Sequence, residues 1–117
     1  MSRLASPEYR TTPDEQLLSE LVRSIVDSVR PHRIVLFGSA ARGEMGPNSD
    51  LDILIVMPGG THRRRTAQQA YRSLRSLGIS KDVIVVTEYD IREHSNNPSL
   101  ILAPALREGK EIYHAVE

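Results

Sequence analysis

An apolar run preceded by two closely spaced aspartates constrains this chain more than any other stretch. Asp50 and Asp52 stand directly before Ile53-Leu54-Ile55-Val56-Met57, whose length and β-branched content predict a buried strand. Alternate side chains of a strand share a face, so both carboxylates point the same way, with Cα atoms about 6.6 Å apart. Two acids at the head of an apolar strand are costly unless a cation neutralises them. The pair therefore indicates a divalent metal site.

Other apolar segments predict the rest of a sheet. The run Arg33-Ile34-Val35-Leu36-Phe37 leads straight into Gly38-Ser39, and Lys81-Asp82 opens the run Val83 to Val86. Asp82 repeats the placement of an acid at the edge of an apolar strand, although aspartates that simply face water are also common there. Ile112 to His114 is a candidate for a short edge strand.

Helical patterns separate these strands. Thr12 is the expected N-cap of a helix with Pro13 at its first position, which Pro31 ends. A second helix is expected from Thr61, as its cap, to Leu77, with Gly78 closing it. Shorter helices are predicted at 40–43, at 88–94 after a Thr87 cap, and from Asn97-Pro98 to Gly109 with a kink at Pro104.

These elements predict an α/β (α+β) fold, a small mixed sheet of three to four strands backed by helices. The expected organisation is a flexible arm over residues 1–11 and a single domain over 12–117. The formal net charge of zero and the pI near 6.9 give no reason to expect direct nucleic-acid binding. Cysteine is absent and no apolar run reaches the length of a membrane span, so a cytoplasmic protein is expected.

Two further features allow more than one interpretation. Gly38-Ser39 after a strand suits close approach to a phosphate, but many strand-to-helix turns use this pair for geometry alone. No acid occurs from Ile53 through Lys81, whereas six basic residues do; they could attract a nucleoside triphosphate or an acidic partner, or could form a solvated face. The four histidines show no metal-ligand spacing.

Taken together, Gly38-Ser39, the spaced Asp50-x-Asp52 and the third acid Asp82 resemble the nucleotidyltransferase superfamily of DNA polymerase β. The small size and the Ala-Ala-Arg-Gly turn are similar to its minimal nucleotidyltransferase branch, whose members are antitoxins paired with a HEPN-domain toxin.

The resemblance implies a role for each motif residue. Asp50, Asp52 and Asp82 would be catalytic and would hold two magnesium ions. Gly38 and Ser39 would bind the triphosphate of ATP, and Arg42 and Ser49 are further candidates for nucleotide binding, although Arg42 could equally pack or form a salt bridge.

The implied reaction moves AMP from ATP to a hydroxyl, expected on a tyrosine of the partner HEPN toxin, in an oligomer or hetero-complex. Two alternatives stay open. The chain could neutralise a toxin by binding alone, or it could modify a small molecule.

Overall fold

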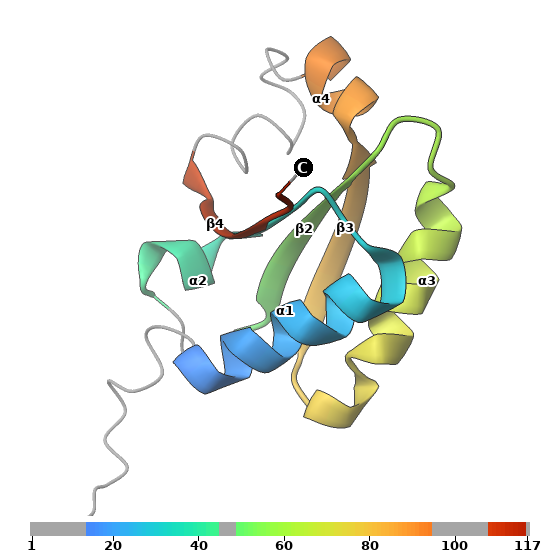
Figure 1. Ribbon diagram of the computed structural model, residues 1–117. Coiled ribbons are helices and arrows are strands. Elements are labelled where there is room, and N and C mark those ends of the chain that lie inside the picture. Colours follow the sequence, from blue (N-terminus) through green and yellow to red (C-terminus); the bar gives the residue numbers. More distant parts are fainter. Residues whose placement is uncertain (1–13, 45–48, 95–107, 117) are drawn as a thin grey trace, which may run out of the picture.

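The computed structural model describes residues 14–44, 49–94 and 108–116. Its centre is a mixed four-stranded sheet in the order β3-β2-β1-β4 (Figure 1). The strands are β1 (Arg33–Phe37), β2 (Leu51–Met57), β3 (Lys81–Thr87) and β4 (Lys110–His114). β1 is antiparallel to both β2 and β4, whereas β2 and β3 are parallel. Parallel pairing requires a crossover, which the helix between β2 and β3 supplies.

Two long helices, α1 (Glu15–Val29) and α3 (Arg63–Ser73), pack against one face of this sheet (Figure 1). The helices present apolar stripes to alternate strand residues, which is the arrangement expected for one buried core. This core includes Leu21, Ile25, Ile34, Leu36, Ile53, Ile55, Ala70, Leu74 and Val83.

The intervening strand residues point to the opposite face and form a smaller apolar cluster of Val35, Phe37, Leu54, Val56 and Val86. Ile91 of α4 (Glu88–His94) packs against it. By the same alternation Asp52 and Asp82 belong to this second face. We call it the acid face.

The predicted fold class is confirmed, including the complete β1 strand and the β4 edge strand. The predicted cap of α4 is also confirmed: the Asp90 N–H donates to Thr87 Oγ1 at 3.1 Å and the Thr87 N–H donates to Asp90 Oδ2 at 2.9 Å. This reciprocal pair is a capping box.

Two helix starts were predicted wrongly. The N-cap of α1 is Asp14 rather than Thr12. The N-cap of α3 is His62, whose ring accepts a hydrogen bond from the Arg65 N–H, because Thr61 Oγ1 instead donates to the Pro58 carbonyl. A short 3₁₀ turn, η3 (Arg75–Leu77), follows α3 and ends at Gly78 as expected.

The expected arm at 1–11 and most of the helix expected between Asn97 and Gly109 lie outside the described residues. Within the described ranges, no helix is long and apolar enough to cross a membrane.

Candidate active site

The three motif aspartates lie at the start of β2 and β3. In the parallel register Asp52 is the partner of Asp82, so their side chains leave the same face of neighbouring strands. Asp50 immediately precedes β2 and shares the parity of Asp52. Two carboxylates that are 30 positions apart in the sequence, Asp52 and Asp82, are thus brought to adjacent places on the acid face, which is the placement that the family resemblance implies.

The environment of Asp52 disfavours its charge. Burial raises the pKa of the Asp52 carboxyl, and repulsion from Asp82 and then from Asp50 raises it further, while Arg42 opposes these effects. Asp52 is partly buried, whereas Asp50 and Asp82 are exposed. The repulsion means that the three carboxylates are near enough to influence one another, which is the arrangement that a bound cation would relieve.

Gly38 lies against Asp52 because its neighbour Phe37 is the β1 partner of Asp52. A Cβ built on Gly38 would overlap Oδ2 of Asp52 and would lie 3.2 Å from its Cγ. The glycine also has φ 68° and ψ −147°, a conformation that other residues rarely adopt. Glycine is therefore required at this turn both by backbone conformation and by the space that the carboxylate occupies.

Asp50 has a partner that the sequence analysis missed. The Ser80 hydroxyl donates a short hydrogen bond to Asp50 Oδ1, and the Leu51 N–H donates to the Ser80 carbonyl at 2.9 Å. Ser80 precedes Asp82 by the same two residues that separate Asp50 from Asp52. Once β2 and β3 are known to be parallel, this equal spacing places Ser80 opposite Asp50.

Carboxylate oxygens are the ligands that magnesium prefers, so the donors fit this ion in chemistry and in position along the strands. Within residues 14–44, 49–94 and 108–116, however, no three His, Cys, Asp or Glu side chains are already grouped to hold a metal. Ser80 occupies only Oδ1 of Asp50, so the other carboxylate oxygen remains a possible ligand for an ion shared with Asp52 and Asp82.

The candidate nucleotide-binding residues lie in the segments that follow β1 and precede β2. Ser39 opens the short helix α2 (Ser39–Arg42), directly after Gly38. Arg42 Nε donates to Glu44 Oε1 at 2.8 Å, and this contact raises the Arg42 pKa. Of the two alternatives for Arg42, the salt bridge is the one present here, between exposed side chains. Ser49 is partly exposed next to Asp50.

A second charged group occupies the far end of the sheet. Glu88 contacts His32 Nδ1 at 3.2 Å and Arg33 at 3.6 Å, and Glu111 contacts Arg33 at 3.9 Å and His114 at 3.3 Å. We call these five residues the ion chain. Arg33 and Phe37 lie at opposite ends of β1, so the ion chain is remote from Asp52.

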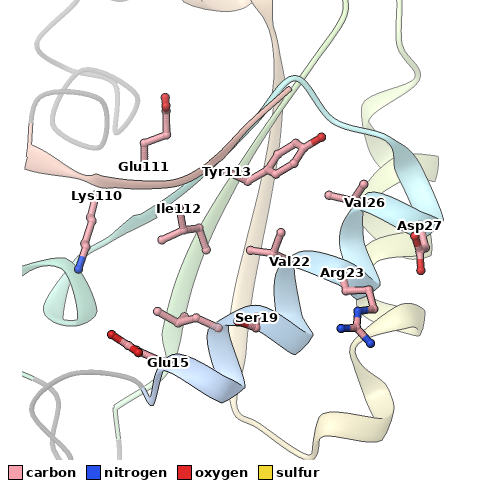
Figure 2. Close-up of a pocket in the computed structure, with 11 residues that line it drawn as sticks. Glu15, Ser19, Val22, Arg23, Val26, Asp27, Lys110, Glu111, Ile112 and Tyr113 are labelled. Carbon is pink, nitrogen blue, oxygen red and sulfur yellow. The ribbon is translucent and has the colours of Figure 1, made fainter. Parts of the chain in front are cut away.

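A groove of about 640 Å³ runs between α1 and β4, away from the acids (Figure 2). Ile112 and Tyr113 of β4 point toward Val22 and Val26 of α1 in this view, and charged residues such as Glu15 and Lys110 lie at its rim. Its lining mixes aliphatic side chains with charged residues of both signs, and it includes none of the residues that the sequence analysis assigned to nucleotide or metal binding.

A family model described as a nucleotidyltransferase domain matches residues 18–105. The chain belongs to this family. The match includes every residue of the candidate site, from Gly38 to Asp82. No curated protein matches the chain.

Two crystal structures share the fold. One, of a Sulfolobus solfataricus protein assigned as a nucleotidyltransferase, has 19% identity and a TM-score of 0.62, covering 95% of this chain and 90% of that one. The other, described as a toxin-antitoxin with AMP-PNP, has 20% identity and a TM-score of 0.57, covering 84% of this chain and 73% of that one. At these identities the likeness establishes the fold of this nucleotidyltransferase domain and nothing finer.

Proposed function

We propose that this nucleotidyltransferase domain transfers AMP from ATP, with magnesium, to a tyrosine hydroxyl of a partner HEPN toxin and thereby acts as its antitoxin. The observation that carries the proposal is the in-register pair Asp52 and Asp82, with Asp50 on the same face and the repulsion among them. The neighbour determined with AMP-PNP supports the choice of an adenine nucleotide and of a toxin as partner.

In the proposed reaction, the acceptor oxygen attacks the α-phosphorus and forms the new P–O bond. The bond from the α-phosphorus to the bridging oxygen breaks, and pyrophosphate leaves. Asp82, exposed at the strand head, would accept the proton of the hydroxyl. Magnesium, when held by Asp50, Asp52 and Asp82, lowers the pKa of an attacking hydroxyl and stabilises the charge on the leaving group.

Gly38 and Ser39 would bind the triphosphate. The absence of a side chain at Gly38 lets the backbone pass close to Asp52, so phosphates held by this turn would lie beside the carboxylates. Catalysis would then consist mainly of positioning and charge neutralisation, with little covalent work for the protein. In this proposal Arg42 exchanges Glu44 for phosphate, and Ser49 adds a hydroxyl.

The test is incubation of the chain with ATP labelled on the α-phosphate, magnesium and the HEPN toxin. Label should move to the toxin, and mass spectrometry should find one or more AMP groups on a tyrosine. The double variant Asp50→Ala with Asp52→Ala is the control and should lose at least 10³-fold in rate, roughly the effect of removing a main electrostatic contribution. A wild-type rate equal to that of the double variant would remove the proposal.

One observation favours neutralisation by binding alone as a second candidate. The groove between α1 and β4 offers a partner a surface of mixed apolar and charged side chains that does not include the three motif aspartates. The triple variant Asp50→Ala, Asp52→Ala, Asp82→Ala separates the two functions in cells that express the toxin. If it still protects the cells, binding is sufficient; if protection is lost while the complex persists, transfer is required.

A further inference from the structure

The solvent side of α3 carries a group of arginines that the proposed chemistry does not use. Their side chains are exposed, and none has an acidic partner among the described residues. We call this group, Arg64, Arg65 and Arg72 of α3 with Arg75 of η3, the arginine face.

Folding of α3 does not explain these residues. The first turn of a helix carries the positive end of its dipole, where acidic residues stabilise and basic residues destabilise. This turn instead holds Arg63, Arg64 and Arg65 and no acid. Only Arg63 is compensated, by Asp90 at 3.2 Å. Residues that destabilise a helix and have no compensating contact are typical of functional surfaces.

The spacing extends the positive charge along the molecule. Arg65 and Arg72 are two helical turns apart, which corresponds to about 10.5 Å along the axis. Arg75 continues the face toward the chain segment that contains Ser80, the partner of Asp50. In Figure 1 the lower end of α3 accordingly leads into the end of β3 where Asp82 lies. The arginine face itself lies on the solvent side of α3, and α3 covers the face of the sheet opposite the acid face, so the two surfaces can be tested separately.

The chemistry of the face favours carboxylates of a protein over nucleic acid. The whole chain has zero net charge, whereas nucleic-acid-binding domains are usually strongly basic. Tyr71 is the one aromatic residue of α3, and its hydroxyl is engaged by the Val83 N–H at 2.9 Å. The helix therefore offers a single aromatic ring, and not the series of rings on which successive bases of a single strand stack. Arginine is enriched in protein interfaces and pairs with carboxylates through two parallel hydrogen bonds.

We propose that the arginine face docks an acidic surface of the partner protein, which presents several carboxylates to these arginines. This inference rests on the proposed function only in that the partner is the protein acceptor. Docking itself needs neither ATP nor magnesium, so it can be tested without transfer.

The probe is fluorescent poly-L-glutamate, which presents carboxylates without any specific fold. Anisotropy is measured at low salt with the full chain, without nucleotide. The variant Arg65→Glu, Arg72→Glu, Arg75→Glu should bind at least about tenfold more weakly than wild type, since each exposed ion pair contributes modestly and three are reversed.

The matched control is Arg23→Glu, Arg30→Glu, Arg92→Glu. These side chains are also exposed and without an acidic partner among the described residues, and the net charge changes equally. The control should lose less than about threefold. Melting curves establish that both variants fold, and Arg→Gln versions replace either one that does not.

Three results would overturn the proposal: no binding by wild type, equal losses in the two triple variants, or tighter wild-type binding to poly-uridylate than to poly-glutamate. Asp50→Ala with Asp52→Ala should keep poly-glutamate binding. Transfer that proceeds in wild type while poly-glutamate fails to bind would therefore reject the docking face and leave the proposed function intact.

Discussion

The two ends of the acid face handle charge in opposite ways. At one end Asp50, Asp52 and Asp82 bring like charges together, and the repulsion raises the pKa of Asp52. At the other end the ion chain alternates acid and base, so that Glu88 and Glu111 each lie between two basic groups. The same sheet therefore carries a strained site, where like charges repel one another, and a satisfied site, where each acid is paired with basic groups. Repulsion among carboxylates beside a well-compensated network of ion pairs is the arrangement that the proposed metal chemistry would require.

Gly38→Ala should have the largest effect, because it disturbs the end of the acid face where the three aspartates lie. The new methyl group would collide with Asp52 in a conformation that only glycine readily adopts. We expect destabilisation of about 1–3 kcal/mol from the backbone. Transfer activity should fall roughly 100-fold or more, because small displacements of reacting groups are costly. Urea unfolding and the labelled-ATP assay measure the two effects.

Gly78→Ala is the matched control for that prediction. Gly78 also has a positive φ, 61°, but a Cβ there would meet nothing within 4 Å. It should lose about 1 kcal/mol of stability and keep its activity. Equal activity losses in the two variants would show that the contact between Gly38 and Asp52 is irrelevant to function.

A smaller effect is expected at the satisfied end. Glu88→Gln removes the charge that joins His32 and Arg33. Because these groups are partly exposed, the free energy of unfolding should fall by about 0.5–1 kcal/mol, with no change in transfer. Glu93→Gln, an exposed residue of the same helix, should change neither quantity. A loss of transfer in Glu88→Gln with unchanged stability would mean that the ion chain belongs to the active site.

The smallest effect is expected from Asp52→Asn, which removes the charge of Asp52 and so relieves the repulsion among the three carboxylates. Since the folded-state pKa of Asp52 is raised above its ordinary value of 3.8, the folded state favours its protonated form. The contribution of protonated Asp52 to the free energy of unfolding is fully present below pH 3.8. It is lost as the pH rises through the pKa that Asp52 has in the folded state. Asp52→Asn should therefore melt higher than wild type at neutral pH, by roughly a few degrees, and the difference should shrink in acid.

Magnesium provides the control for that last prediction. Millimolar magnesium with ATP should raise the melting temperature of wild type, because ligands that bind the native state stabilise it. The rise should be absent in Asp52→Asn. If magnesium does not change the melting temperature of wild type, and Asp52→Asn does not melt higher than wild type, the three aspartates do not repel one another appreciably.

Apolar, β-branched runs were sufficient to locate the strands, although β2, β3 and β4 each begin two residues before the run that predicted them. The run from Arg33 to Phe37 was predicted with its correct bounds. The parity of Asp50 and Asp52 also follows from local geometry. That Asp82 joins them was expected from its strand-start position and from the family resemblance, and it depends on the parallel register of β2 and β3.

Features set by tertiary contacts could not be read in the same way. The overlap between Gly38 and Asp52 depends on which β2 residue lies opposite Phe37. The Ser80 bond to Asp50 depends on the pairing of β2 with β3. The prediction of the α3 N-cap was wrong for a local reason. Thr61 and His62 are both able to cap the helix, and the Thr61 hydroxyl donates to the Pro58 carbonyl instead.

The parallel pairing of β2 with β3 has a consequence for the order of folding. Asp52 and Asp82 become neighbours only after the intervening segment, including all of α3, has closed back onto the sheet. Long closures of this kind are slow relative to local pairing. A partly folded chain that has formed β1 against β2 would therefore hold Gly38 beside Asp52 and still lack its third carboxylate. Native-state hydrogen exchange at β3 would then report directly on whether the three aspartates of the proposed site are assembled.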